Sequence, residues 1–503
     1  MVAGNNSFHI DWADRARRLK LQAMNFIEGR WVEGAGERIT KFAPRDGARL
    51  LEFASGNAQD VDRVVRSARA AFEDGRWSKL PVQKRQAALC KFASLLERNR
   101  EAFALLECLD VGKPICAAME FDVPMAAAVI RYTAEAADKV HGDVYGVDQS
   151  SVSYELRRPV GVVAAIVGWN FPLLLAAGKL GPILAMGNCL ILKPSELTAL
   201  SATRLAEVAM EAGIPEGVFN VIVGDGTVGS ELARHGGVDL VTFTGSTQTG
   251  KRLLVASGES NMKRTILECG GKAPCIVFDD SPDLEQVADA IVSRAFWNQG
   301  QVCTASSRLL VQSSIKGELL DIIIKRADEL RPGDPLDPKT RFGAVVSRGH
   351  KEKILSYIDV GRAQGARMIY KSDAPSPYRD GFYVPPVVFD NVDPSHRIAQ
   401  EEVFGPLLSV LSFRDEDEAV EIANGTVYGL SAIVWTKSLA RAHRVTHGVK
   451  AGWVVVNATA RPTGGPGVGA LTVGGHKESG IGAEGGLCGL EEYTTKTAVQ
   501  WFV

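Results

Sequence analysis

The chain has 503 residues, of which 46% are apolar and 23% are charged, so it has the composition of a globular protein and not of a disordered one. Its length exceeds what one hydrophobic core usually serves, and two or three packed units are expected. The formal net charge is −2 without a long block of one sign, which argues against a nucleic-acid or membrane-surface partner and favours a small-molecule one.

The eight cysteines indicate a reducing environment. They form no CxxC pair and show no zinc-type spacing with histidine, so the sequence predicts no metal site. So few cysteines in so long a chain are typical of a compartment without disulfides. The first residues are charged where a signal peptide needs an apolar stretch, and we therefore expect a cytoplasmic protein.

The first part of the chain has helical periodicity. Apolar residues recur at helical spacing from Asp60 to Phe72, and Gly75 follows as a stop signal. Further helices are predicted between Lys84 and Asp110. The pattern then changes to alternation from Val152 to Leu156, which predicts a partly exposed strand.

An uncharged run covers residues 159–178 and, at 20 residues, is long enough to span a membrane. Two prolines, three glycines and Asn170 interrupt it. An apolar strand, a turn and an apolar helix explain this composition better than a membrane span, because a parallel strand buried on both faces is also continuously apolar.

From Gly161 onward, short apolar strands alternate with helical segments, and a second series follows Gly271. This alternation predicts an α/β protein with a doubly wound parallel sheet. The expected strands lie at 162–167, 189–193, 219–223, 240–245 and 273–278.

The end of the chain combines a loop with a strand. The glycine-rich stretch 462–486 has no regular period, so we expect a loop and exclude repeat architectures. Residues 497–503 alternate as an edge strand would. A free terminal strand can pair with another chain, which points to an oligomer.

Two glycine motifs resemble phosphate-binding loops. Residues 224–229 (GDGTVG) satisfy GxGxxG between a predicted strand and helix, although a chain with 51 glycines can match it by chance. Residues 245–251 (GSTQTGK) match most of a P-loop, but Arg252 replaces the magnesium-binding hydroxyl, which excludes nucleoside triphosphate hydrolysis. Free backbone N–H groups near Gly245 and Ser246 can hold a diphosphate, but a structural turn is the simpler interpretation of this motif alone.

The stretch LKPSE places Lys193 and Glu196 at the end of a predicted strand, where the hydroxyls of an adenosine ribose can be held. Alone, it is more simply the start of a capped helix. Glu196 would repel a 2′-phosphate, so the cofactor hypothesis favours NAD over NADP.

Three residues suggest nucleophilic chemistry. Cys303 is followed by small residues that leave room around a sulfur, whereas structural cysteines usually lie among larger apolar neighbours. Glu268 lies in an apolar, glycine-bounded stretch, where desolvation raises a carboxyl pKa and makes a base, although a paired surface acid is the ordinary alternative. Asn170 lies in the uncharged run, where a buried amide needs partners and can donate to an oxyanion.

These motifs occur together in a known order. The stretches GWNFP, LKPSE, FTGST, LECGGKAP, NQGQVCTAS, EEVFGP and GGHKESG follow one another with the spacing of the aldehyde dehydrogenase superfamily. The chain resembles that superfamily over nearly its whole length. Chance matches would not all occur in the order found in the family. The set of motifs together therefore outweighs the simpler interpretation of each one alone.

The resemblance implies a Rossmann-type NAD domain, a second α/β catalytic domain and a small β oligomerisation element. It also implies a homodimer or homotetramer. The implied boundaries are 1–139 with 161–270 for the NAD domain, 271–483 for the catalytic domain, and 140–160 with 484–503 for the oligomerisation element.

The resemblance further implies the reaction. The Cys303 thiolate attacks the aldehyde carbon, and the Asn170 amide and the Cys303 N–H hold the oxyanion of the thiohemiacetal. Hydride passes to NAD, and Glu268 activates the water that hydrolyses the thioester. Lys179 also matches a family position.

Cofactor contacts follow from the same resemblance. The pairs Lys193 with Glu196, Trp169 with Ser246, and Glu402 with Phe404 correspond to the adenosine ribose, the phosphates and the nicotinamide end. The full set of implied cofactor-binding residues is Trp169, Lys193, Glu196, Gly226, Gly245, Ser246, Glu402 and Phe404.

Several stretches look most like bacterial gamma-glutamyl-gamma-aminobutyraldehyde and guanidinobutyraldehyde dehydrogenases, which implies an aminoaldehyde of polyamine catabolism as substrate. The chain departs from the usual pattern at Gly168, which replaces proline, at Gly178, which replaces a pocket tryptophan, and at Ala483, which replaces arginine. The long loop after Asn457 carries Arg461, which offers nothing to a cationic substrate.

Acidic and aromatic aldehydes therefore remain alternatives, with Phe171, Trp297 and Arg461 as candidate pocket residues. A thiol esterase that needs no cofactor would use the same cysteine, and a non-catalytic relative would keep only the fold. Coenzyme-A-acylating relatives usually lack the deacylating acid, so Glu268 favours hydrolysis.

Overall fold

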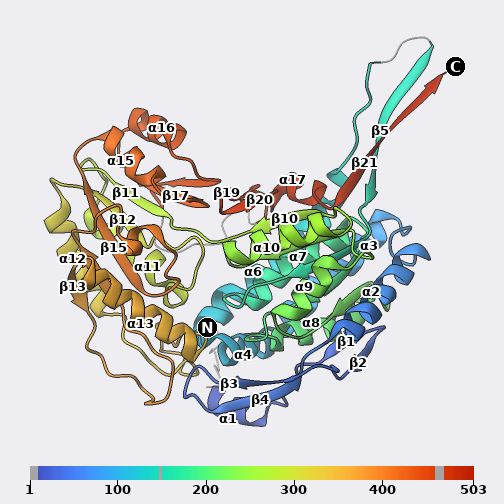
Figure 1. The fold of residues 1–503 in the computed structure, drawn as a ribbon, viewed down its shortest axis with the longest axis horizontal. Helices are drawn as coiled ribbons and strands as arrows, with labels where there is room; N and C mark the ends of the chain where they lie inside the picture. Colours follow the sequence, from blue (N-terminus) through green and yellow to red (C-terminus); the bar gives the residue numbers. More distant parts are fainter. Residues whose placement is uncertain (1–9, 147–149, 459–468, 503) are drawn as a thin grey trace, which may run out of the picture.

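The structure, a computed structural model, describes residues 10–146, 150–458 and 469–502 (Figure 1). Two large sheets lie on either side of the molecule, each covered by helices, and a two-stranded arm projects from one side (Figure 1). This is the α/β architecture that the alternating sequence pattern predicts.

The first sheet has eight strands in the order β2-β1-β8-β7-β6-β9-β10-β20. Its centre, from β8 to β10, is parallel, whereas β1, β2 and β20 run antiparallel to their neighbours. The strands are β1 (Asn25–Ile27), β2 (Arg30–Val32), β6 (Val162–Ile166), β7 (Cys189–Lys193), β8 (Phe219–Val221), β9 (Leu240–Thr244), β10 (Arg264–Glu268) and β20 (Gly480–Ile481).

The uncharged run forms β6 and then helix α7 (Pro172–Ala185), as expected from its prolines and glycines. All five residues of β6 are buried, because helices cover both faces of the sheet. Within the described ranges, none of the helices has both the length and the apolar content that a bilayer crossing requires. Strand β8 ends two residues before the predicted boundary, where the N–H of Val223 donates to the side chain of Asn25.

Two groups of helices pack on this sheet. In the first group, helix α2 contacts β6 and β7 and packs on α9, and α9 packs on α10. The second group consists of α7 and α8, with α3, α4 and α6 packed behind them. The helix predicted at residues 60–72 is α2, which begins at a capping box made by Asn57 and Asp60. The helices are α2 (Ala58–Glu73), α3 (Val82–Arg98), α4 (Arg100–Val111), α6 (Val123–Ala136), α8 (Leu200–Ala212), α9 (Gly226–Arg234) and α10 (Thr247–Glu259).

The second sheet has seven strands in the order β13-β14-β15-β12-β11-β17-β18, all parallel except β13. The strands are β11 (Pro274–Val277), β12 (Arg308–Gln312), β13 (Arg367–Lys371), β14 (Val387–Asp390), β15 (Leu407–Phe413), β17 (Ser431–Trp435) and β18 (Trp453–Val456). Its helices are α11 (Leu284–Phe296), α12 (Lys316–Asp328), α13 (Arg348–Ala363), α14 (Arg397–Gln400), α15 (Glu416–Asn424) and α16 (Leu439–Gly448).

The arm consists of β5 (Ser151–Pro159) paired antiparallel with β21 (Thr494–Phe502), so the predicted exposed strand and the predicted terminal strand meet (Figure 1). Trp501 and Phe502 near its tip are 62% and 79% exposed. Exposed aromatic residues on a two-stranded ribbon are typical of a surface that another chain covers.

Smaller elements complete the fold. A second ribbon, β3 (Arg38–Phe42) with β4 (Arg49–Ala54), lies at the lower edge of the molecule in Figure 1. The others are α1 (Trp12–Arg18), α5 (Ile115–Ala117), α17 (Gly486–Glu491), a π-helical turn (Ala118–Asp122), 3-10 turns (Ala137–Lys139 and Trp297–Gly300), β16 (Tyr428–Gly429) and β19 (His476–Lys477).

Candidate active site

The segment before Cys303 folds into a left-handed turn. Asn298, Gln299 and Gly300 have φ angles of 47°, 57° and 72°. A Cβ atom on Gly300 would clash with the main-chain oxygen of Gly405, so no larger residue fits there. Non-glycine residues in this conformation are strained and persist only where neighbouring groups hold them, which makes the turn a candidate functional feature.

Asn170 is one of the groups that hold this turn. It lies between β6 and α7 and is 8% exposed. Its side-chain amide donates to the main-chain oxygen of Gln301 over 3.0 Å, and the amide of Asn298 donates to the Asn170 main-chain oxygen over 2.9 Å. An amide nitrogen carries two protons, so the Asn170 amide keeps a second proton for another acceptor beside the cysteine loop.

Gly270 and Gly271 let two further segments approach. A Cβ on Gly271 would clash with the main-chain oxygen of Cys303, and one on Gly270 would lie 2.6 Å from a carboxylate oxygen of Glu402. The two glycines lie two and three residues after Glu268, which ends β10. They therefore bring the cysteine, the candidate base and Glu402 to one place.

The thiol of Cys303 is only partly exposed. Desolvation, together with the charges of Glu402 and Glu268, raises its pKa to about 12, against the opposing effect of the N–H groups of Thr304 and Cys303. The protonated thiol is therefore the main form at neutral pH. A nucleophile at this position needs a neighbouring proton acceptor.

Glu268 has the properties of such an acceptor. Desolvation raises its pKa to about 8, the charge of Glu484 adds to the shift, and Lys179 opposes it. Its Oε1 atom is buried and has no hydrogen-bond partner among the described residues. A carboxylate with a free, desolvated oxygen is a stronger base than one in water.

Lys179 and Glu484 form a buried ion pair next to Glu268. Lys179 is 1% exposed, so its ammonium depends on this partner. Glu484 is fixed through two 2.8 Å main-chain hydrogen bonds with Val473. No motif singles out Glu484, which is one acid in a glycine-rich stretch and becomes part of the site only through the fold.

Groups that suit the adenosine end of a dinucleotide lie at the carboxyl ends of the parallel strands. Lys193, the last residue of β7, is 4% exposed, and its ammonium is 3.7 Å from a carboxylate oxygen of Glu196. An ammonium donor beside a carboxylate acceptor matches a ribose diol. This edge of a doubly wound sheet is where such folds bind nucleotides.

Two helix N-termini open at the same edge. Helix α9 begins at Gly226, and α10 begins directly after its N-cap Ser246. The N–H of Gly245 is already bonded to the main-chain oxygen of Glu268, so N–H groups of the first turn of α10 are the candidate donors to a diphosphate. These donors, with the Lys193 and Glu196 pair, fit NAD chemically.

Three rings gather where the two sheets meet. Trp169 packs edge-on against Phe404 and His350, with ring centroids 5.1 and 4.9 Å away. A ring nitrogen of His350 lies 2.8 Å from the main-chain oxygen of Phe404, whose φ is 59°. Burial lowers the pKa of His350 to about 4, so the ring is neutral and donates to that oxygen. The sequence analysis did not predict His350, which is the third residue of α13 and belongs to no motif.

Glu402 lies beside this group of rings. Its Oε1 accepts a 2.9 Å hydrogen bond from the N–H of Gly271. Burial raises its pKa to about 7. The structure thus brings Glu402 and Phe404, which the family resemblance implies for the nicotinamide end, and Trp169, which it implies for the phosphates, to the junction that also holds Cys303.

An aromatic wall continues from the catalytic groups. Phe121, on the π-helical turn, packs against Trp297 at 5.2 Å and against Phe171 at 6.4 Å, measured between ring centroids. The ammonium of Lys113 lies 4.1 Å from the centroid of Phe171 on this wall. The predicted pocket residues Phe171 and Trp297 are therefore joined through Phe121. Arg461 lies outside the described residues.

Helix α7 continues the wall with a partly exposed stripe. Leu174, Leu175 and Gly178 are partly exposed on a helix whose other residues are buried, and they share one face with Phe171 by helical spacing. A Cβ on Gly178 would meet no atom within 4 Å. The fold does not require glycine there, and a helix interior disfavours it by about 1 kcal/mol, so its effect is to leave space.

The sequence model of the aldehyde dehydrogenase family matches residues 31–499. The NADP/NAD-dependent aldehyde dehydrogenase PuuC of Escherichia coli (strain K12) is 45% identical over 487 residues, 96% of each chain. The P. syringae indole-3-acetaldehyde dehydrogenase AldA, solved with NAD+ and IAA, is 46% identical with a TM-score of 0.95 over 98% of this chain and 99% of that one. The gamma-glutamyl-gamma-aminobutyraldehyde dehydrogenase of Burkholderia cenocepacia J2315 is 44% identical, with a TM-score of 0.94 over 97% and 98%.

The close approach at Gly271 yields a first prediction. Gly271→Ala should push the Cys303 main chain away, destabilise the fold by about 1 to 3 kcal/mol and lower kcat by about tenfold or more. Thermal unfolding and steady-state kinetics measure both effects. Gly258→Ala in α10, where a Cβ meets no atom within 4 Å, is the matched control and should leave both quantities nearly unchanged. Normal kcat in Gly271→Ala would contradict the packing argument.

Proposed function

The chain belongs to the aldehyde dehydrogenase family, and from that premise we propose that Cys303, Glu268 and Asn170 carry out its NAD-dependent oxidation of an aldehyde to a carboxylic acid. The observation that carries the proposal is the pair of hydrogen bonds between Asn170 and the turn before Cys303. They bring an oxyanion donor from one sheet to a nucleophile that precedes a strand of the other.

In the first step the Cys303 thiol loses its proton to Glu268, and a bond forms between sulfur and the aldehyde carbon. The carbonyl oxygen becomes an oxyanion, which accepts from the second Asn170 amide proton and the Cys303 N–H. When bound, NAD supplies the acceptor for the hydride that leaves this carbon. The product on the enzyme is a thioester on Cys303.

In the second step a water attacks the thioester carbon and gives a proton to Glu268. The carbon–sulfur bond breaks, the carboxylic acid leaves, and the thiol is restored. Glu268 must lose a proton between the two steps. The Lys179 ammonium favours that loss because it stabilises the Glu268 carboxylate, whereas the charge of Glu484 opposes it.

We propose that Lys193 and Glu196 hold the adenosine ribose, that Trp169, Gly226, Gly245 and Ser246 shape the phosphate region, and that Glu402 and Phe404 hold the nicotinamide end. This assignment is supported by the Lys193–Glu196 distance and by the packing of Trp169 on Phe404. Glu196 would repel a 2′-phosphate, which favours NAD over NADP.

For the substrate we propose an aminoaldehyde or its gamma-glutamyl derivative. The support is the 44% identity with the gamma-glutamyl-gamma-aminobutyraldehyde dehydrogenase of Burkholderia cenocepacia. However, the identity with the indole-3-acetaldehyde dehydrogenase is 46%, which is as high. Overall identity therefore does not choose between the two substrate classes.

A second candidate is an aromatic aldehyde. The wall of Phe121, Phe171 and Trp297 is apolar, and Gly178 leaves open space along the same face of α7. Offset rings and space for a wide group favour a planar apolar substrate over a compact cation.

We also propose the division into an NAD domain (1–139 and 161–270), a catalytic domain (271–483) and an oligomerisation element (140–160 and 484–503). The projecting β5–β21 arm supports a homodimer or homotetramer, because exposed apolar side chains line it. Eight free cysteines support a cytoplasmic location.

Replacing the nucleophile tests the central proposal. Cys303→Ala should lower NADH formation by roughly a thousandfold or more, because no sulfur remains to form the thioester. Calorimetric titration should show NAD binding close to that of the unchanged protein. Turnover at the normal rate in this variant would refute the mechanism.

Replacing the base separates the two steps. At neutral pH, Glu268→Gln should release about one equivalent of NADH per site and then stall, because water is no longer activated. In the unchanged protein, thioester hydrolysis should rise between pH 7 and 9, since the base acts deprotonated and its pKa is about 8. Stopped-flow and steady-state assays measure both, and a full steady-state rate in the variant would assign the base elsewhere.

Filling the space at residue 178 tests the second substrate candidate. Gly178→Trp should lower kcat/KM for indole or phenyl acetaldehyde by about tenfold or more and that for propanal by less than about threefold. Gly178→Ala is the matched control and should change neither, since its Cβ meets open space. Equal effects of tryptophan on both substrates would show that the stripe does not line the aldehyde pocket.

A further inference from the structure

Lys41 is a charged residue at a buried position of strand β3. In β3, Ile39 and Lys41 face inward while Thr40 and Phe42 face outward. Lys41 is 4% exposed, whereas Phe42 is 49% exposed. A lysine is almost never fully buried without a partner, and here an exposed phenylalanine stands next to it. The burial of apolar surface would favour Phe42 over Lys41 at the buried position, so another interaction must account for the buried lysine.

The ammonium of Lys41 lies at the end of helix α4. It donates a 2.7 Å hydrogen bond to the main-chain oxygen of Asp110, the second-last residue of that helix. The last carbonyls of a helix lack partners within it and carry its negative partial charge. Burial lowers the pKa of Lys41 to about 8, and the charge of Asp110 opposes this shift, so the ammonium is the main form at neutral pH.

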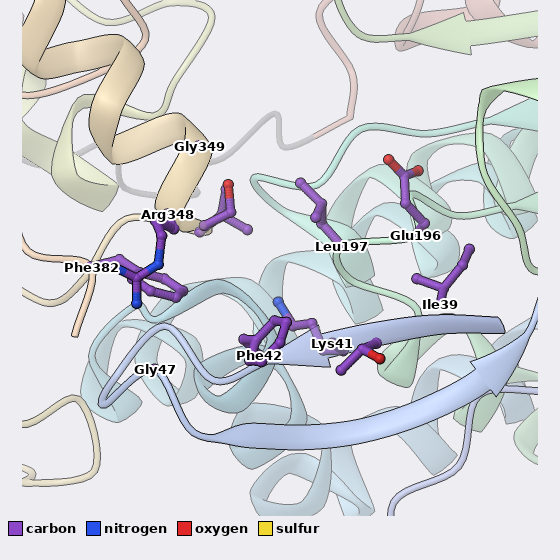
Figure 2. Close-up of a pocket in the computed structure, with 12 residues that line it drawn as sticks. Ile39, Lys41, Phe42, Gly47, Glu196, Leu197, Arg348, Gly349 and Phe382 are labelled. Atoms are coloured by element: carbon purple, nitrogen blue, oxygen red, sulfur yellow. The ribbon is translucent and has the colours of Figure 1, made fainter. Parts of the chain in front are cut away.

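Asp110 connects this cation to the cofactor loop. Its Oδ2 accepts a 2.9 Å hydrogen bond from the N–H of Leu200, the first residue of α8. The segment between β7 and Leu200 contains Glu196 and Leu197. Both of these line one pocket together with Lys41, and Figure 2 shows them across the pocket from the strand that carries Ile39, Lys41 and Phe42.

Three separate segments therefore meet at Asp110: the β3 ribbon through the Lys41 ammonium, the end of α4, and the start of α8 through the N–H of Leu200. The reaction proposed above does not use the Lys41 charge. Oxygen atoms at a helix end with an inserted ammonium form the kind of environment that also suits a small monovalent cation, since both bind carbonyl and carboxylate oxygens.

We propose that the Lys41 ammonium is a tethered cation that positions the Glu196 loop for the adenosine ribose of NAD. The inference rests on the cofactor assignment of Lys193 and Glu196 proposed above. It makes Lys41 a positioning residue, because it acts through Asp110 and the start of α8. A free cation of similar charge should do the same work if the lysine is shortened and space is left for it.

The test compares two variants of the full chain in a buffer whose only cation is bulky, such as choline. Lys41→Ser removes the charge and leaves room, whereas Lys41→Met removes the charge and fills the room with a side chain of similar length. Losing a charge-assisted hydrogen bond should weaken the Kd of NAD about tenfold in both variants. Calorimetric titration measures this value, and kcat at saturating NAD should stay within about twofold.

Potassium or methylammonium chloride at about 0.1 M should then restore NAD affinity in Lys41→Ser and not in Lys41→Met. Unchanged affinity in both variants would overturn the proposal, and so would equal recovery of both or recovery of neither. If Lys41→Ser does not fold, normal NAD affinity in Lys41→Met suffices to overturn it. A failure here with normal behaviour of Cys303→Ala and Glu268→Gln would leave the proposed reaction intact.

Discussion

The contact between Asn170 and the turn before Cys303 is the constraint on which the site depends. Asn170 follows a strand of the first sheet, and Cys303 precedes a strand of the second, so neither sheet alone contains the site. The left-handed turn at residues 298–300 is strained, and the hydrogen bonds of Asn170 and Asn298 offset part of that cost. The hydrogen bonds across the junction therefore fix the positions of Cys303 and Asn170, the proposed nucleophile and oxyanion donor, relative to each other.

The same junction sets the electrostatics of the site. Burial at the meeting of two sheets removes water from Cys303, Glu268 and Glu402, and desolvation is the largest cause of each raised pKa. A raised pKa weakens the thiol as a nucleophile and strengthens the carboxylate as a base. Glu484 adds to the rise in the pKa of Glu268 and Lys179 limits it, and the resulting pKa of about 8 lets Glu268 exchange protons in both directions near neutral pH.

Buried charges also occur on the cofactor side of the molecule. Lys193 at the end of β7 and Lys41 in β3 carry buried ammonium groups. The first lies near the carboxylate of Glu196, three residues further along, and the second donates to the main-chain oxygen of Asp110 in a distant segment. Charges of this kind stabilise the fold little, because desolvation consumes most of the attraction. Their contribution is to define positions. If Glu196 holds a ribose as proposed, its loop gains accuracy when such a charge fixes it to a helix end.

Much of this protein was determined by its sequence. Alternating apolar strands and helices predict the α/β fold, because a doubly wound sheet buries both faces of its strands, and the family motifs predict Cys303, Glu268, Asn170 and the cofactor residues. The tertiary structure alone decided the rest. Glu484, His350 and Lys41 belong to no motif, and they acquire partners only when segments that are distant along the chain pack together, since burial and hydrogen bonding depend on proximity in space and not on order in the sequence.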